Sequence, residues 1–219
     1  MAELTRSQGS DRSMRLGISR RTFLKHGGTS AMGAALMETG AAQAAVDSSI
    51  QDDGNEVLGP GPIPIDLTIN GRRVAVQAEP ATTLVDILRN YLGLTGTKIG
   101  CDRGACSACT VWLDGQPASS CMTLALDARG RSITTIEGLA DGDRLHPVQQ
   151  AFVEHDALQC GFCTPGMVMS CAALINRKPD AGPEDVKAAI SGHLCRCGTY
   201  PNIFAAVLQV ASENRTGGI

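Results

Sequence analysis

The stretch CDRGACSACTVWLDGQPASSC, from Cys101 to Cys121, decides how the fold of this chain is predicted. Its thiols Cys101, Cys106 and Cys109 lie in one short loop with the spacing C-x4-C-x2-C, and eleven residues separate Cys109 from Cys121. Thiolates are soft ligands that suit iron and zinc, and this spacing before a distant fourth cysteine is typical of a plant-type [2Fe-2S] cluster. The four cysteines therefore predict an iron–sulfur cluster, with zinc as the main alternative.

Glycines accompany these cysteines at Gly100 and Gly104. Without a side chain, the backbone of such a loop can approach a cluster closely. Its N–H groups can then donate hydrogen bonds to the sulfurs and, together with solvent exposure, help set the reduction potential. The loop composition therefore agrees with the cluster prediction.

A second set of four thiols consists of Cys160, Cys163, Cys195 and Cys197, which form a C-x2-C pair and a distant C-x-C pair. This spacing alone is less decisive, because the same four thiolates could hold a tetrahedral zinc ion. The ninth cysteine, Cys171, lies on the apolar stripe of a predicted helix, and we expect it to be a buried, unreactive thiol.

Composition excludes several other functions. The chain has 219 residues, enough for one large or two small domains, and its net charge of -3 indicates neither a nucleic-acid partner nor an anionic membrane. Nine cysteines in crowded pairs argue against a simple disulfide framework, although an oxidising compartment would favour one. No Ser/His/Asp set, carboxylate pair or phosphate loop stands out, so we expect no catalytic residue on this chain.

Residues 1–44 are expected to form a cleavable signal of the twin-arginine type. Arg20 and Arg21 precede a weakly apolar run that is too short to span a bilayer, and the small-residue site Ala42-Gln43-Ala44 follows. The alternative is a basic disordered tail. Resemblance to this signal implies export of a folded, cofactor-loaded protein to the periplasm, and residues 45–63, rich in glycine and proline, read as a linker.

Residues 64–140 contain the signals of a small β-rich domain. Apolar alternation on both sides of Asn70-Gly71 predicts a hairpin with a type I′ turn, and a further hairpin turn is expected at Asp114-Gly115. Between them a helix with one buried face is predicted, with Gly93 just after its end. Its expected buried positions are Leu84, Ile87, Leu88 and Tyr91. The order hairpin, helix, ligand loop and strands, with strands at residues 110–113 and 132–136, resembles the β-grasp ferredoxin fold.

Residues 141–213 are expected to be helical. Four short helices are predicted, beginning at Pro147, at Thr164, at Pro183 and at Pro201. The thiols of the second set then fall at helix junctions. The expected fold class is α+β, with a ferredoxin-like domain followed by a four-helix [2Fe-2S]-binding domain.

Longer stretches carry a family resemblance. Gln159–Met167, QCGFCTPGM, and Cys195–Ile203, CRCGTYPNI, resemble the C-terminal [2Fe-2S]-binding domain of the molybdenum hydroxylase (xanthine oxidase) family. Thr97–Cys101, Ala108–Val111 and Ile136–Leu139 resemble its N-terminal ferredoxin-like domain. With the expected signal, the chain is most similar to the small iron–sulfur subunits of periplasmic aldehyde dehydrogenases (aldehyde oxidoreductases) of the three-subunit type.

The resemblance implies an electron-transfer subunit with two [2Fe-2S] clusters. A large partner would carry molybdopterin, usually as its cytosine dinucleotide, and oxidise the aldehyde, and electrons would pass on to an FAD subunit or another acceptor. It implies that the second set of thiols faces the molybdopterin side and the first set faces the flavin side. It also implies that Gln159 hydrogen-bonds the pterin cofactor, the alternative being an ordinary polar residue at a helix end.

Two residues depart from the family pattern. Ser107 stands where the family commonly has glycine, and His193 stands where it commonly has asparagine. His193 could be a fifth ligand or act in proton coupling, but we expect a capping or surface residue.

Two other functions stay open. One is the same kind of subunit serving an N-heterocycle or purine hydroxylase, which this chain can barely distinguish because the substrate pocket would lie in the partner. The other is a zinc-stabilised exported binding module. A lone ferredoxin-like carrier is disfavoured, because it needs neither a second site nor a helical domain.

Overall fold

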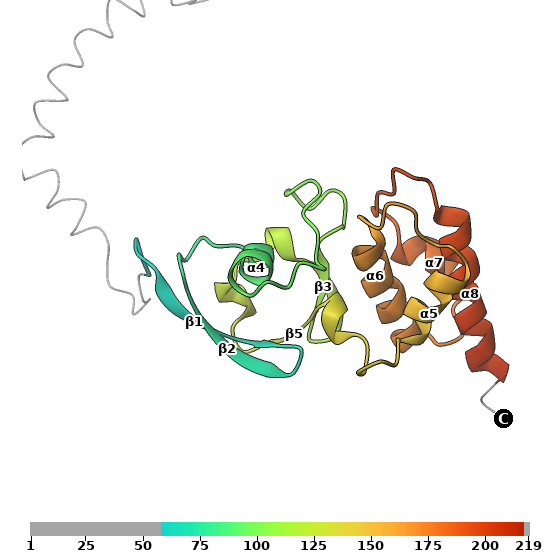
Figure 1. Ribbon diagram of the computed structural model, residues 1–219, viewed down its shortest axis with the longest axis horizontal. Helices are drawn as coiled ribbons and strands as arrows, with labels where there is room; N and C mark the ends of the chain where they lie inside the picture. Colours follow the sequence, from blue (N-terminus) through green and yellow to red (C-terminus); the bar gives the residue numbers. More distant parts are fainter. Residues whose placement is uncertain (1–57, 217–219) are drawn as a thin grey trace, which may run out of the picture. The chain divides into compact units, whose positions relative to one another are not determined.

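The computed structural model describes residues 58–216, which form a five-stranded sheet followed by helices α5 to α8 (Figure 1). The expected signal of residues 1–44 and most of the expected linker lie outside these residues. A mixed sheet combined with helices places the chain in the predicted α+β class. No helix of the described part is long and apolar enough to cross a membrane.

The sheet has the strand order β2-β1-β5-β3-β4. Strands β1 (Ile63–Ile69) and β2 (Arg72–Ala78) form an antiparallel hairpin, and β1 pairs in parallel with β5 (Ser132–Thr134). Strand β3 (Thr110–Leu113) is antiparallel to both β4 (Gln116–Ser119) and β5. Since β3 begins directly after Cys109, the sheet fixes one end of the first cysteine loop.

Both hairpin turns are where the sequence predicts them. Asn70 and Gly71 have φ values of 50° and 75°, and Asp114 and Gly115 have 52° and 77°. A type I′ turn needs positive φ at both central residues, which Asn and Asp tolerate and Gly adopts freely. The turn chemistry therefore sets the register of β1 with β2 and of β3 with β4.

The helix after the first hairpin differs from the prediction in its second half. It begins as α4 (Leu84–Asp86), capped by Thr83, and continues as the π-helical segment η2 (Ile87–Tyr91), where the N–H of Leu92 bonds the carbonyl of Ile87 at 3.1 Å. A π turn holds one more residue than an α turn, so it rotates Tyr91 off the apolar stripe. Tyr91 is 50% exposed, and its predicted burial was wrong.

The sheet and this helix share one hydrophobic core. Strand residues alternate between this core and solvent, as a half-buried sheet requires. Gly93, with φ of 68°, follows the helix as predicted. The fully buried members with the largest side chains are Ile65, Leu67, Leu84, Ile87, Leu88 and Ile133.

Three short 3-10 turns connect these elements: η3 (Ser120–Met122), η4 (Leu126–Ala128) and η5 (Ile136–Gly138). The turn η3 contains Cys121 and packs beside α4. The fourth thiol of the first set is therefore held by a rigid turn against the sheet domain.

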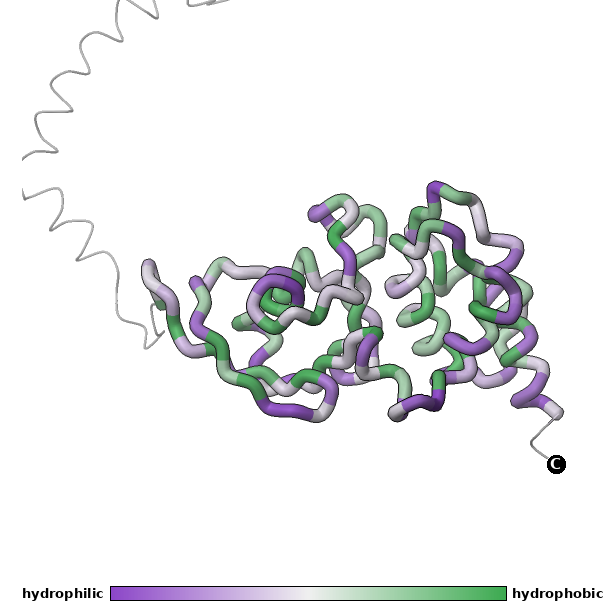
Figure 2. Tube along the Cα trace, viewed as in Figure 1, coloured by the Kyte–Doolittle hydropathy of each residue, from purple (hydrophilic) through white to green (hydrophobic). Residues whose placement is uncertain are grey.

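The helical part consists of α5 (Pro147–Glu154), α6 (Thr164–Arg177), α7 (Pro183–Ala189) and α8 (Tyr200–Thr216). Helix α6 is central, since every residue from Gly166 to Ile175 is buried, and Figure 2 shows hydrophobic residues along it. A helix that is apolar on all sides needs neighbours around it. Helices α5, α7 and α8 and strand β3 provide them.

The observed helix boundaries agree with those predicted from the sequence to within a few residues. Helices α5, α6 and α7 begin where prolines predict, whereas α8 begins at Tyr200, one residue before Pro201. Helix α7 ends at Ala189, earlier than the predicted end near Gly192. His155 follows α5 as its C-cap, and His146 is its N-cap.

The sheet and the helices meet along α6. The indole N–H of Trp112 on β3 donates a buried hydrogen bond of 2.8 Å to the carbonyl of Met169. One turn earlier, Gly166 lies so close to the first cysteine loop that a Cβ there would overlap the carbonyl oxygen of Ser107. The absence of a side chain at Gly166 therefore allows the close contact between α6 and this loop.

We expect Gly166→Ala to destabilise the protein by about 1–3 kcal/mol, because the added methyl group strikes backbone that is itself fixed. In an exposed helix the same change would stabilise by about 1 kcal/mol. Thermal unfolding measures whether the change in stability is a loss or a gain. Gly61→Ala is the control, because a Cβ at Gly61 meets no atom within 4 Å. Equal stability of the two variants would contradict the close contact.

Candidate iron–sulfur sites

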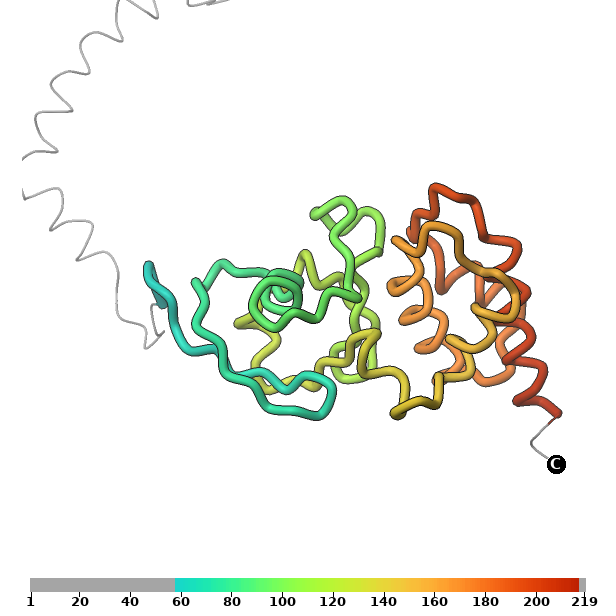
Figure 3. The backbone as a smooth tube through the Cα atoms, viewed as in Figure 1, coloured from blue at the N-terminus to red at the C-terminus, as the bar shows by residue number. Residues whose placement is uncertain are grey.

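The first cysteine loop turns its backbone N–H groups toward its thiols. The N–H of Gly104 bonds the sulfur of Cys121 at 3.3 Å, and the N–H of Ala105 bonds the sulfur of Cys101 at 3.1 Å. Positive φ values at Asp102, Gly104 and Ser107 fold the chain into this shape, seen in Figure 3 as a green loop that projects from the sheet. Such N–H groups are the donors that a cluster with four thiolates requires.

The four thiols of the first set, three in this loop and one at Cys121, form two pairs. A hydrogen bond from the N–H of Arg103 and one from the thiol of Cys106 lower the pKa of Cys101 to about 7, against the opposing effect of burial. Burial and, to a smaller extent, donation of its thiol to Cys109 raise the pKa of Cys121 to about 11, against the opposing effect of the N–H of Gly104. These hydrogen bonds group the thiols as Cys101 with Cys106 and Cys109 with Cys121. A [2Fe-2S] core takes four thiolates, two on each iron, so two such pairs suit it.

Gly100 is needed for the close packing around this site. A Cβ at this position would lie 2.9 Å from the sulfur of Cys106, closer than real Cβ atoms approach. At Gly104, where φ is 71°, the conformation itself favours glycine. The sequence-based expectation that these two glycines allow the backbone to approach the sulfurs is confirmed.

The second set of thiols lies at helix junctions, as predicted. Cys163 is the N-cap of α6 and Cys160 lies exposed just before it, while Cys195 and Cys197 lie between α7 and α8. The structure therefore brings together, at the start of α6, the thiols of Cys163 and Cys195, which are 32 residues apart in sequence.

The thiols of Cys163 and Cys195 contact each other across this junction. Burial raises the pKa of Cys163 to about 12, and the hydrogen bond that it donates to Cys195 acts in the same direction. Burial would also raise the pKa of Cys195, but hydrogen bonds from Thr199, from Cys163 and from the N–H of Gly198 lower it to about 7. The hydroxyl of Thr199 lies 3.3 Å from this sulfur. Cys195 is therefore the thiol of this pair that ionises more readily.

Tyr200 fixes the loop that carries Cys195. Its hydroxyl accepts a hydrogen bond of 2.8 Å from the N–H of Cys195 and donates one of 2.8 Å to the carbonyl of His193. This role of Tyr200 could not be predicted, because nothing in the local sequence pattern shows that its hydroxyl reaches back to residues 193 and 195.

The two cysteine loops touch each other. The N–H of Leu194, next to Cys195, donates a hydrogen bond of 3.2 Å to the carbonyl of Cys106. Cys106 of the first set is thereby joined by one hydrogen bond to Leu194, the neighbour of Cys195 in the second set. Spacing within either motif could not predict this contact.

His193 was expected to be a capping or surface residue, and the surface part of this expectation was wrong, because only 7% of its surface is exposed. Its Nε2 lies 2.9 Å from the hydroxyl of Ser170 and 3.2 Å from the carbonyl of Gly166, both on α6. Its Nδ1 is buried without a hydrogen-bond partner among the described residues. Burial lowers the pKa of His193, which favours a neutral ring.

Two remaining residues lie where their predicted roles require. Cys171 is 0% exposed in the middle of α6, and burial raises its pKa to about 12, so the prediction of a buried thiol is confirmed. Gln159 is exposed beside Cys160, where its amide can reach a partner. Its contact with a pterin stays a prediction.

The arrangement of the thiols decides which kind of metal centre fits each site. Within residues 58–216, no three His, Cys, Asp or Glu side chains form a group of the kind that holds one ion. The first site instead offers two thiol pairs with N–H groups directed at the sulfurs, which fits a two-iron cluster. The second site offers one contacting pair, Cys163 with Cys195, and two further thiols on the same loops.

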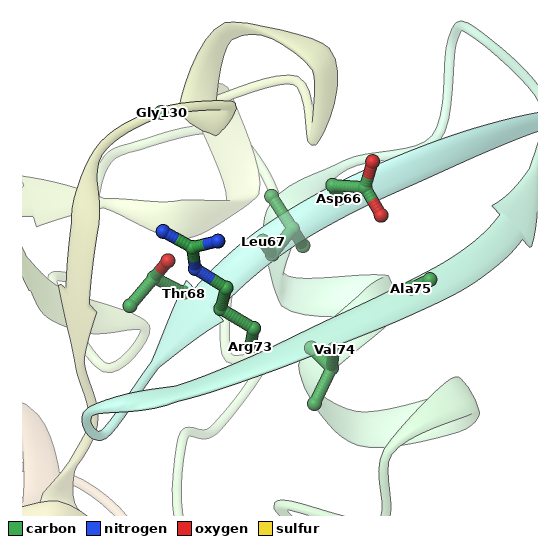
Figure 4. Close-up of a pocket in the computed structure, with 7 residues that line it drawn as sticks. All are labelled: Asp66, Leu67, Thr68, Arg73, Val74, Ala75 and Gly130. Carbon is green, nitrogen blue, oxygen red and sulfur yellow. The ribbon is translucent and has the colours of Figure 1, made fainter.

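A hollow of about 540 Å³ lies elsewhere, over the hairpin of β1 and β2 (Figure 4). Its lining includes Asp66, Thr68, Arg73 and Gly130, and no cysteine. Both sets of cysteines therefore lie outside the lining of this hollow.

We expect Cys121→Ser to lower the iron content of the purified protein by about half, because it removes one ligand of one cluster. Cys171→Ala, the matched control, should keep the full content, since Cys171 is inert and remote from the ligand loops. Iron and acid-labile sulfide are measured per chain. Loss of iron from Cys171→Ala, or full iron in Cys121→Ser, would contradict the assignment of ligands.

Comparisons with known proteins identify both parts of the described chain. Residues 67–134 match the family model of the 2Fe-2S iron-sulfur cluster binding domain, and residues 135–208 match that of the [2Fe-2S] binding domain. The chain therefore has two domains of types that bind [2Fe-2S] clusters.

Two similar proteins match most of the length of this chain and of their own. The nicotine 6-hydroxylase small subunit of Paenarthrobacter nicotinovorans is 48% identical over 157 residues, which are 71% of this chain and 94% of that protein. The aldehyde oxidoreductase iron-sulfur-binding subunit PaoA of Escherichia coli O157:H7 is 37% identical over 213 residues, which are 90% of each chain.

A solved structure is similar to this chain in both fold and sequence. A chain of quinoline 2-oxidoreductase from Pseudomonas putida 86 superposes with a TM-score of 0.67 at 44% identity, and the match covers 72% of this chain and 99% of that one. With its two cluster-binding domains and these relatives, the chain belongs to the family of iron–sulfur (small) subunits of molybdenum hydroxylases.

Proposed function

We propose that this chain is the electron-transfer subunit of a molybdenum-containing aldehyde dehydrogenase. In this proposal Cys101, Cys106, Cys109 and Cys121 hold one [2Fe-2S] cluster, and Cys160, Cys163, Cys195 and Cys197 hold the other. The hydrogen bond from Leu194 to Cys106 carries the proposal, because it joins the two ligand sets within one chain. When bound, such clusters accept and release single electrons.

The residues of the chain support this task without taking part in bond chemistry. Gly104 and Ala105 direct N–H groups at thiolate sulfur, which offsets negative charge and stabilises the reduced state of a cluster. The hydroxyl of Thr199, 3.3 Å from the sulfur of Cys195, can donate to a thiolate there with the same effect. Trp112 ties the sheet to α6 and so holds the two domains in fixed contact.

We propose that a large molybdopterin-binding subunit, with the cofactor as its cytosine dinucleotide, docks over the second site. Gln159 and Cys160 are exposed there, and Phe162 and Leu194 are 48% and 62% exposed. Apolar side chains so exposed beside a cofactor site suit the core of an interface. Gln159 would then hydrogen-bond the pterin.

An FAD subunit is proposed to dock over the first site. Met122 and Leu124 follow Cys121 and are exposed large apolar residues, and Tyr91 is a third on the same domain. The loop residues Asp102 to Ala105 are exposed as well, so this cluster would lie close to the surface of the subunit. A short distance to the surface favours electron exchange with a partner.

The aldehyde is proposed as substrate of the complex because of the length of the match. The PaoA subunit of Escherichia coli O157:H7 aligns over 213 residues and 90% of this chain, so that similarity extends into the N-terminal stretch, whereas the PaoA subunit of strain K12 aligns over 166 residues. The nicotine 6-hydroxylase subunit aligns over 157 residues.

An N-heterocycle hydroxylase is the second candidate. The relatives named for nicotine and quinoline are 48% and 44% identical, both above the 37% of PaoA. The same subunit type serving such a substrate would keep every feature described above.

Export to the periplasm by the twin-arginine route also remains a proposal. It rests on Arg20, Arg21 and the small-residue site that follows them. Residues of this stretch lie outside the described part of the chain.

We expect the complex, purified anaerobically with its partners, to contain about four iron and four sulfide per copy of this chain. Its iron–sulfur absorption should bleach on addition of an aromatic or aliphatic aldehyde. Nicotinate and hypoxanthine are the comparison substrates. Bleaching by these compounds and not by aldehydes would favour the second candidate, and zinc in place of iron at either site would contradict the relay itself.

A further inference from the structure

His193 attaches the second cysteine loop to α6. Its Nε2 faces both the hydroxyl of Ser170, at 2.9 Å, and the carbonyl of Gly166, at 3.2 Å. A carbonyl can only accept, so Nε2 carries the hydrogen and donates it toward α6. Nδ1, which has no partner among the described residues, is then the nitrogen without a hydrogen. The ring is therefore a fixed cross-link between the two segments.

The backbone of His193 is fixed from its other side. Its N–H donates to the carbonyl of Ile190 at 2.9 Å, and its carbonyl accepts from the hydroxyl of Tyr200 at 2.8 Å. Side chain and main chain together leave the peptide between His193 and Leu194 little freedom to rotate.

The N–H of that peptide is the donor that bonds the carbonyl of Cys106 at 3.2 Å. The side chain of Leu194 is 62% exposed, so its own packing contributes little to the position of this N–H. A second contact, from the hydroxyl of Ser107 to the carbonyl of Gly192, is long at 3.5 Å and therefore weak. The contact between the two loops thus depends mainly on how His193 is held.

We propose that His193 is a positioning residue for electron transfer between the two clusters, because it holds the N–H of Leu194 against the carbonyl of Cys106. This inference rests on the proposed relay. In the step concerned, the reduced cluster at the second site loses one electron and the oxidised cluster at the first site gains it. No covalent bond forms or breaks, and no proton leaves the chain.

The test compares His193→Ala with His193→Gln in the complete complex. The amide nitrogen of glutamine reaches about as far as Nε2 and can donate to the carbonyl of Gly166, whereas alanine removes both contacts of the ring with α6. His155→Ala is the matched control, because His155 is a half-buried histidine that bonds Gln209 on α8, away from the cysteines.

Two measurements are made on complexes with full iron. Hydrogen exchange reports the Leu194 amide, and freeze-quench EPR after one-electron photoreduction reports how fast the two clusters share the electron. His193→Ala should speed exchange of this amide about tenfold and slow electron sharing several-fold. His193→Gln and His155→Ala should behave like the unaltered complex.

Unaltered amide exchange and electron sharing in His193→Ala would overturn the proposal. If His193→Ala fails to retain iron, the test is made with Ser170→Ala, which keeps the histidine ring and removes one of its two hydrogen-bond partners. Faster exchange of the Leu194 amide in this variant supports the proposal. An unchanged exchange rate overturns it. Failure of the relay itself would look different, because the unaltered complex would then lack EPR signals from two clusters.

Discussion

The approach of backbone N–H groups to cysteine sulfur is the interaction on which the rest of the structure depends. Four thiolates carry more negative charge than a two-iron core neutralises, so their stability depends on donors directed at them. Gly104 and Ala105 provide such donors at 3.3 and 3.1 Å, and Gly100 leaves room for the sulfur of Cys106. Strand β3 fixes the loop at its C-terminal end, and turn η3 holds Cys121, whose sulfur accepts from Gly104 in the middle of the loop.

Helix α6 extends this constraint from one site to the other. Its N-cap is Cys163, its first turns receive the close contact with Ser107 and the ring of His193, and its middle accepts the indole N–H of Trp112. Because the helix is buried on all sides, it cannot shift without disturbing the sheet, the helical domain and the second cysteine loop together. A buried central helix thus suits the proposed task of keeping two redox centres at a constant separation.

Much of this could be predicted from the sequence, because the signals are local. The turns at Asn70 and Asp114, the prolines that begin the helices, and the spacing of the cysteines each act within a few residues. The features that were missed depend on contacts between distant segments: the burial of His193 is imposed by α6, and the Leu194 bond joins positions 88 residues apart. The exposure of Tyr91 follows from a π turn that leaves no mark in the apolar pattern.

The low-temperature EPR spectrum of the fully reduced complex tests the central claim most directly. Two [2Fe-2S] clusters held on touching loops of one rigid chain should give two distinct signals, each split by the magnetic field of the other. A spectrum with a single unsplit signal, or with none, would contradict the account of this chain as a two-cluster relay.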